Sequence, residues 1–298
     1  MKSEDNLLSP KEAFQHIRRI QIATKRNVDD LFAGMYRSAF KGRGLEFEGV
    51  REYQPGDDVR TIDWNVTAKL QHPYVKNYRE ERELTVMLVV DVSASARFSH
   101  TTQLKSEWIA EIGALIAFSA IKNHDKVGLL LFTDEVELYL KPKKGVRHVL
   151  RVIRELLFFQ PRGTGTDLQK ALSFFGQVQR RQAICFLISD FLAPDSFEHE
   201  IRIASKRHEL IAIRIYDEYE KIFPSTGLIM LRDLESGEIA LVDSSDAFVQ
   251  KNYQSQAEGR QTALKQTIAK AGAELISIST EASYTKALYR FFKERRKR

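Results

Sequence analysis

The chain has 298 residues, of which 43% are apolar and 29% are charged, and its formal net charge is +6. These values are typical of a globular protein that buries a substantial core. No stretch reaches about 18 uninterrupted apolar residues, and the first residues lack the apolar centre of a signal peptide, so neither a membrane span nor export is expected. The one cysteine, Cys185, can form no disulfide within the chain, which fits a cytoplasmic protein.

The positive charge is spread along the chain, apart from a dense basic run at residues 293–298. Basic proteins often bind nucleic acid, but no helix-turn-helix pattern, zinc-finger spacing or RNA-binding aromatic motif accompanies this charge. Nucleic acid is therefore not the expected partner. An acidic protein surface would use the same charge equally well.

Residues 1–41 show the pattern of a helical preface. Ser9, Pro10 and Glu12 form a helix start, with a capping serine, a proline at the first helical position and the glutamate of a capping box. Apolar residues then recur at near-helical spacing as far as Met35. The charges along this stretch are mixed in sign, which favours a helix docked on the main domain over one that lies on a membrane.

Residues 42–83 change character, with glycine and proline punctuation, alternating apolar residues and many charges. Residues 46–48 and 50–53 are predicted as short exposed strands, and residues 55–58 as a turn. We expect the whole of residues 1–83 to pack on a main domain that residues 84–298 form.

Charged side chains crowd the predicted turn. Arg51 and Arg60 are expected to form ion pairs there, and Trp64 is expected to anchor a small satellite core. The acidic residues within reach of the arginines are Asp57, Asp58 and Asp63. Two interpretations remain open, because such charges either fasten a hairpin to its neighbour or form a surface that a partner recognises.

A strand buried on both faces is predicted for residues 84–91, where apolar residues do not alternate with polar ones. Asp91, Ser93 and Ser95 follow at its solvent-facing end. Ligands bind beyond the carboxyl ends of strands in an open α/β sheet, so this strand delivers one carboxylate and two hydroxyls to such a crevice. These hard oxygens suit Mg²⁺, or else Ca²⁺ or Mn²⁺. Alone, the pattern is also compatible with a serine-rich turn that caps the next helix.

Two later segments strengthen the metal interpretation. The loop at residues 160–167 has two glycines and two threonines, Thr164 and Thr166, before a predicted helix, which Thr166 or Asp167 would cap. A second apolar strand, residues 183–190, ends at Asp190. The loop lacks the Lys-Ser/Thr ending of a P-loop and follows a helix, so nucleotide binding is not expected there.

Strands and helices alternate through the rest of the chain. The predicted strands are residues 126–132, 135–140, 183–190, 210–216 and 274–279. The predicted helices are residues 104–119, 148–159, 168–175, 196–208, 246–271 and 284–293. A hairpin is predicted as an insertion at about residues 227–243. The expected class is α/β, with a doubly wound, mostly parallel sheet of the Rossmann type, an N-terminal helical and β-hairpin extension, and this inserted hairpin.

The ordered set of an Asp-x-Ser-x-Ser motif, a threonine and an aspartate resembles the von Willebrand factor A fold with its metal-ion-dependent adhesion site. The matching residues are Asp91, Ser93, Ser95, Thr164 and Asp190. By this resemblance they surround one divalent cation, and Thr164 is the metal threonine, although its role and that of Thr166 can be exchanged.

Residues 42–83 resemble the signature of a bacterial family called domain of unknown function fifty-eight, whose members join such a segment to a von Willebrand A-like domain. The resemblance extends from Gly42 to about Phe292. It implies that the protein works beside a MoxR-type AAA+ ATPase, as an adaptor or substrate receptor in a chaperone-like system.

The expected function is a non-enzymatic, metal-dependent protein-binding module. In this arrangement the three hydroxyls hold Mg²⁺ directly, the two aspartates act mostly through water, and an open position accepts an Asp or Glu from the partner. One alternative is a metal-dependent phosphotransferase or hydrolase with Asp91 as nucleophile. Its support is thin, since Ser93 stands where one phosphatase pattern needs a second aspartate and no base is evident nearby in sequence. A structural remnant that no longer binds metal is the other alternative.

Overall fold

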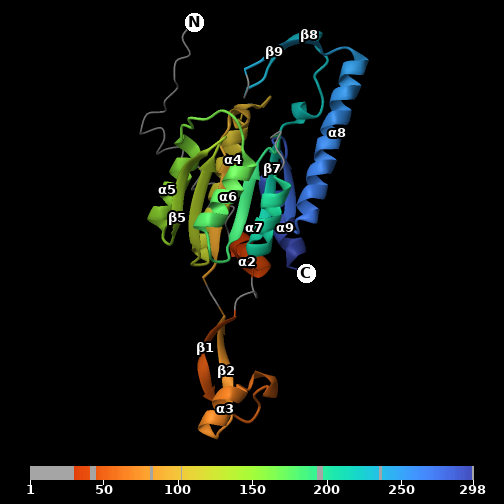
Figure 1. Ribbon diagram of the computed structural model, residues 1–298. Helices are drawn as coiled ribbons and strands as arrows, with labels where there is room; N and C mark the ends of the chain where they lie inside the picture. The colour runs from red at the N-terminus through yellow and green to blue at the C-terminus, as the bar shows by residue number, and fades with distance from the viewer. Residues whose placement is uncertain are drawn as a thin grey trace.

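A six-stranded sheet forms the centre of the molecule (Figure 1). The computed structural model describes residues 30–40, 45–80, 83–101, 103–192, 197–234 and 237–296. The strands are β3 (Thr85–Asp91), β4 (Lys126–Phe132), β5 (Val136–Lys143), β6 (Ile184–Ser189), β7 (Glu209–Tyr216) and β10 (Glu274–Ser279). Their order is β10-β7-β6-β3-β4-β5, and all neighbours are parallel except β4 and β5. This order confirms the predicted doubly wound α/β class.

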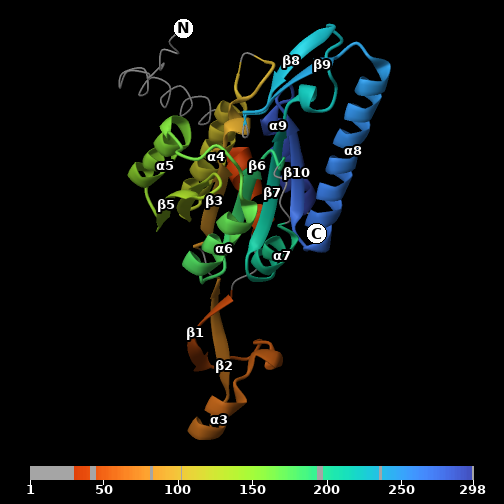
Figure 2. The same cartoon turned by 45° about the horizontal axis from the view of Figure 1, so that its top comes forward.

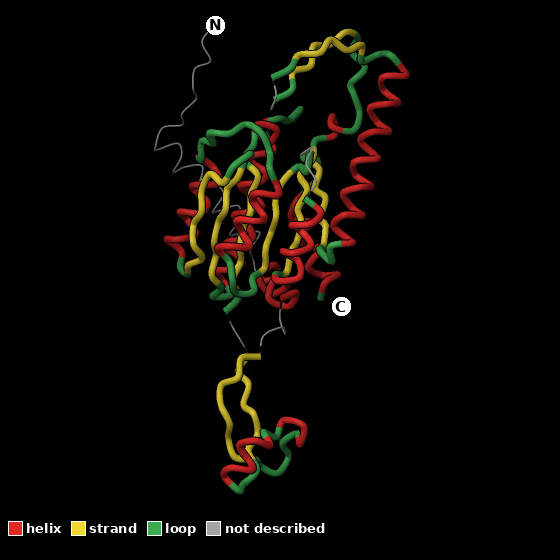
Figure 3. The backbone as a smooth tube through the Cα atoms, in the orientation of Figure 1, coloured by secondary structure: helices red, strands yellow, loops and turns green. Residues whose placement is uncertain are grey.

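Helices cover both faces of the sheet (Figure 3). One face packs against α2 (Asp30–Phe40), α4 (Lys105–Lys122), α5 (Val146–Phe158) and α9 (Tyr284–Arg295). The other face packs against α6 (Leu168–Val178), α7 (Glu198–Arg207) and α8 (Ala247–Lys270). The helices predicted after residue 84 are all present within a few residues of their predicted bounds, because their apolar stripes face the sheet.

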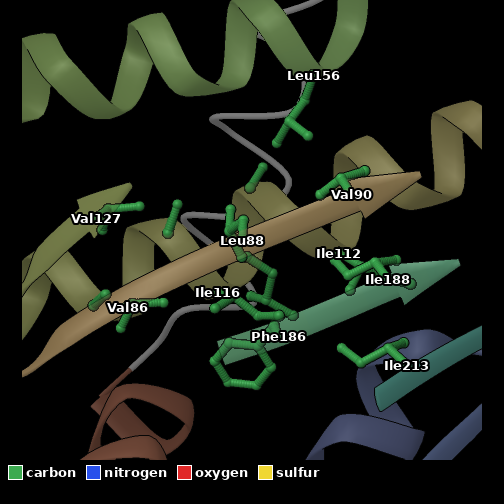
Figure 4. Close-up of a cluster of buried hydrophobic side chains, with 14 of the residues drawn as sticks. Val86, Leu88, Val90, Ile112, Ile116, Val127, Leu156, Phe186, Ile188 and Ile213 are labelled. Carbon is green, nitrogen blue, oxygen red and sulfur yellow. The ribbon is translucent and has the colours of Figure 1, made fainter. Parts of the chain in front are cut away.

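The core on the first face gathers side chains that lie far apart in the sequence. Figure 4 shows Leu88 of β3, Ile116 of α4 and Phe186 of β6 packed together, and all three are fully buried. β3 and β6 are buried along their lengths, as their unbroken apolar runs predict. They therefore hold their carboxyl ends in fixed positions.

Helix α2 is docked on the main domain. Tyr36 and Phe40 are buried, and the ring centroids of Phe40 and Phe292 lie 5.6 Å apart. The hydroxyl of Tyr36 donates to Asp125 Oδ2 at 3.1 Å. The predicted helix start at residues 9–12 lies outside the described residues.

Residues 45–80, which make up most of the signature segment (residues 42–83), form a separate unit. In it β1 (Leu45–Glu52) and β2 (Tyr74–Glu80) pair antiparallel, with η1 (Val59–Thr61) and the unpredicted α3 (Trp64–Leu70) between them. In both views the unit extends away from the amino ends of the central strands (Figures 1 and 2). The expected packing of this segment on the main domain is thus not observed.

Polar contacts organise the turn of this unit, and Val75 of β2 is buried. Arg51 donates to both carboxylate oxygens of Asp57 at 2.7 Å, and Arg60 pairs with Asp58 at 3.1 Å, which confirms two of the expected ion pairs. Trp64 is 66% exposed, so its predicted role as a core anchor is wrong. A two-stranded sheet with one short helix has too little inner surface to enclose an indole.

The inserted hairpin lies at the opposite end of the sheet, beyond the carboxyl ends of the strands (Figure 2). It consists of β8 (Leu228–Arg232) and β9 (Ile239–Asp243), and Gly237, with a φ of 76°, provides the predicted glycine turn. Side chains on one of its faces are between 63% and 73% exposed. They are Leu228, Met230, Ile239 and Leu241.

Candidate metal centre

The sheet order brings the two predicted strand ends together. β3 and β6 are parallel neighbours in register from Val86 and Ile184 to Val90 and Ile188. Asp91 ends β3, and Asp190 follows β6 directly. The order of the sheet reverses between these two strands, and such a switch point is where ligands bind in doubly wound folds.

Asp91 is held by hydrogen bonds to both of its carboxylate oxygens. The amide of Ser93 donates to Oδ1 at 2.9 Å, and the hydroxyl of Ser189, at the end of β6, donates to Oδ2 at 2.7 Å. Burial, followed by the negative charge of Asp190, raises the pKa of Asp91 to about 7. The side chain is 2% exposed and Ser93 is fully buried, so the expectation that these residues face solvent is wrong.

Two hydroxyls lie in front of this carboxylate. Ser93 directly precedes the short helix η2 (Ala94–Arg97) without a capping hydrogen bond from its side chain, and its Oγ lies 3.1 Å from the Oγ of Ser95. Mg²⁺ binds oxygens at about 2.0–2.1 Å in an octahedron, which places neighbouring ligands about 2.9 Å apart. The two hydroxyl oxygens therefore have the spacing of adjacent ligands on such an ion.

The threonine loop lies against the serine turn. The amide of Ala94 donates to the carbonyl of Thr164 at 2.9 Å. Gly163 approaches the end of β4 so closely that a side chain there would collide with Thr133 and Asp134. The loop thus needs glycine at that position.

The two threonines of this loop differ in burial. Thr164 is exposed, whereas Thr166 is 6% exposed. Asp167 is the N-cap of α6, because its carboxylate accepts from the amide of Lys170 at 2.8 Å, and this confirms one of the two predicted caps. Thr166 is therefore not needed as the cap. The exchange of roles between the two threonines stays open.

Asp190 has a cation as its neighbour. Lys105, the first residue of α4, is 1% exposed, and its Nζ donates to Asp190 Oδ2 and to Glu220 Oε1, both at 2.8 Å. The amide of Leu192 donates to Asp190 Oδ1 at 3.2 Å. Burial alone would lower the pKa of Lys105, but the charges of Asp190 and Glu220 outweigh it, and the pKa lies above its ordinary value. The side chain is therefore an ammonium ion.

Sequence reasoning missed Lys105, Ser189 and Glu220. Lys105 and Glu220 are separated from Asp190 by 85 and 30 residues, so no local spacing indicates the contact. The sequence does show Ser189 as a polar residue at the end of an apolar strand. Its position beside Asp91 depends on the strand order, which a strand pattern alone does not define.

The donors at this edge fit a hard divalent cation by their chemistry. Ser93 and Ser95 offer neutral hydroxyl oxygens, while Asp91 and Asp190 have both carboxylate oxygens in hydrogen bonds, which suits a role through water. Clusters of three or more His, Cys, Asp or Glu side chains suited to a metal do not occur among the described residues.

Comparison with solved structures gives distant likenesses. An aerotolerance-related membrane protein from Bacteroides fragilis is 13% identical with a TM-score of 0.48, and the match covers 72% of this chain and 98% of that one. The SpRpn10 VWA domain is 12% identical with a TM-score of 0.39, and the match covers 69% of this chain and 93% of that one. A von Willebrand A domain is thus among the structural neighbours of this α/β chain.

The descriptions of these neighbours bear on the predicted cytoplasmic location. Similar structures include proteins described as membrane or membrane-spanning proteins, from Bacteroides fragilis and Vibrio fischeri. This contradicts the prediction, which we withdraw. Among the described residues, no helix has both the length and the apolar character that crossing a membrane requires.

Sequence relatives cover nearly the whole chain. The uncharacterized protein Rv1480 of Mycobacterium tuberculosis is 30% identical over 283 residues, which are 94% of this chain and 89% of that protein. Residues 49–263 match the family described as "Protein of unknown function DUF58", which includes most of the signature segment and of the central sheet. The chain therefore belongs to the DUF58 family.

Proposed function

We propose that the chain is a non-enzymatic, metal-dependent protein-binding module. Ser93, Ser95 and a threonine of the 160–167 loop would hold Mg²⁺, and Asp91 and Asp190 would act through water. Neutral oxygens leave most of the ion's charge uncompensated, so the ion would attract a further anionic ligand. A partner's aspartate or glutamate would supply that ligand.

The spacing of the serine hydroxyls is the observation that carries this proposal. Two buried or half-buried Oγ atoms lie 3.1 Å apart at the switch point of a doubly wound sheet, in front of a buried carboxylate. A serine turn that served only as a helix cap would bond the backbone of η2, yet Ser93 makes no such capping hydrogen bond.

The partner we propose is a MoxR-type AAA+ ATPase, for which this chain would be an adaptor or substrate receptor in a chaperone-like system. The family resemblance supports this choice. The net charge of +6 favours an acidic partner surface in addition.

The enzyme alternative, a phosphotransferase or hydrolase that uses Asp91, gains nothing from the contacts of that residue. A nucleophile needs a free oxygen that faces the substrate. Both oxygens of Asp91 accept hydrogen bonds, and the side chain is buried.

Binding of the purified chain to a purified MoxR-type ATPase, measured with Mg²⁺ and with EDTA, tests the proposal. We expect Asp91→Asn, Ser95→Ala and Thr164→Ala to weaken the association at least tenfold in Mg²⁺. Ser173→Ala, an exposed serine on α6, is the matched control and should bind as the wild type does. Thr166→Ala, compared with Thr164→Ala, identifies the metal threonine. Equal binding in EDTA, with none of the site variants affected, would refute a metal-dependent contact.

A further inference from the structure

A buried ammonium ion occupies the position behind the candidate metal centre. Lys105 comes from the start of α4, Asp190 from the end of β6, and Glu220 from η3 (Glu218–Glu220) after β7. The Lys105 Nζ lies 2.8 Å from a carboxylate oxygen of each acid, and each of the three side chains is at most 8% exposed. Three segments of the chain thus meet at one cation.

The charges of this cluster balance without a metal. Arg214 of β7 lies 3.9 Å from the second carboxylate oxygen of Glu220, so two cations face two carboxylates in a nearly dry environment. Unpaired buried charges are costly, and this pairing offsets part of that cost. Asp190 therefore has its counter-ion before any divalent cation arrives.

We infer that Lys105 lowers the affinity of the centre for a divalent cation and so makes its occupation depend on a partner's carboxylate. This inference rests on the proposed function. A divalent ion that approaches Asp190 meets a positive charge already bound to that carboxylate, and repulsion between the two cations is weakly screened in a buried site. An aspartate or glutamate from the partner adds a negative charge that offsets this repulsion. Lys105 is thus a specificity-determining residue, because the metal alone binds weakly and binds tightly only together with an acidic partner.

Opposite charge changes at Lys105 and Glu220 test this role. Calorimetry with Mg²⁺ or Mn²⁺, without any partner, should give at least tenfold tighter binding for Lys105→Met, because the competing cation is gone. Glu220→Gln leaves the ammonium with Asp190 alone and should weaken binding. Lys105→Arg keeps the charge and should stay within about threefold of the wild type.

A purely structural role would give a different pattern. Loss of packing at this cluster would lower the melting temperature and the metal affinity of both charge-changing variants together, and that result would overturn the inference. If Lys105→Met does not fold, Glu220→Gln decides, since unchanged or tighter binding in that variant contradicts the proposed repulsion. Absence of metal binding in the wild type and in every variant would instead refute the proposed function itself. Wild-type binding that Lys105→Met leaves unchanged refutes only the role of Lys105.

Discussion

The central sheet and the two small two-stranded sheets organise the chain in different ways. β3 and β6 are buried on both faces, and the carboxylates at their ends are buried and hydrogen-bonded. The β1–β2 unit is ordered by ion pairs around a turn, and the β8–β9 hairpin exposes large apolar side chains on one face. Burial of apolar area stabilises a fold, whereas exposed side chains contribute little. Stability should therefore reside in the central sheet, and the small sheets should be nearly neutral to substitution.

The largest effect is expected in the central strand. Leu88 of β3 is fully buried in the core that α4 and β6 also form. Leu88→Ala should therefore lower the free energy of unfolding by roughly 2 to 5 kcal/mol, because apolar burial is lost and a cavity remains. Urea denaturation measures this difference. A loss below about 1 kcal/mol would show that the sheet repacks, and the contrast with the small sheets would then disappear.

An effect of intermediate size on the unfolding free energy, and one that depends on pH, is expected at His208, which follows α7 and packs against α6. His208 packs its ring 4.7 Å from Phe175, neither ring nitrogen has a hydrogen-bond partner among the described residues, and burial lowers the pKa of the imidazole to about 4. The unfolded chain takes up a proton near pH 6.5, while the folded protein does not until about pH 4. Stability from this group is complete above pH 6.5 and is lost as the pH falls towards 4.

His208→Leu removes this dependence. The wild type should lose about 1 to 2 kcal/mol of unfolding free energy from His208 between pH 8 and pH 5, and the variant should lack that part of the slope. Denaturant titrations at both pH values provide the comparison. Parallel pH profiles for the two proteins would mean that His208 is protonated in the fold.

A smaller effect is expected at Asp91. Asp91→Asn removes a carboxylate that burial makes costly, and the amide oxygen can still accept one of the two hydrogen bonds, so stability should change by less than about 1 kcal/mol. Thermal melting at pH 8 checks this. A loss as large as that of Leu88→Ala would make the aspartate a structural residue of the sheet.

The smallest effect is expected on the hairpin. Met230→Ser and Leu241→Ser change side chains that are already more than 70% exposed, so each should alter the unfolding free energy by less than about 0.5 kcal/mol. Ala240→Ser on the same hairpin is the matched control. A clear destabilisation by the first two changes, absent in the control, would show that the outer face is covered in solution.

Sequence reasoning predicted the central sheet well and the site in part. Unbroken apolar runs such as residues 84–91 identify buried parallel strands, and Asp91 and Asp190 follow two of them at a shared edge. Strand patterns do not specify which loops fold over an edge, so the burial of Ser93 and the contact between Lys105 and Asp190 were not predictable. In the signature segment, side-chain character suggested ion pairs correctly. It also suggested a buried Trp64. A large apolar side chain indicates burial in a sequence, but the sequence does not show whether the fold provides a surface to cover it.

Anomalous diffraction from crystals grown in about 20 mM Mn²⁺ tests the central claim most directly. We expect one strong manganese peak at the carboxyl ends of β3 and β6, bonded to the hydroxyl oxygens of Ser93 and Ser95, with Asp91 and Asp190 one water away. The same peak should be absent from crystals of Ser95→Ala grown in the same solution. A wild-type map without manganese at this edge, or with the ion bound elsewhere, would contradict the assignment of a metal centre to these residues.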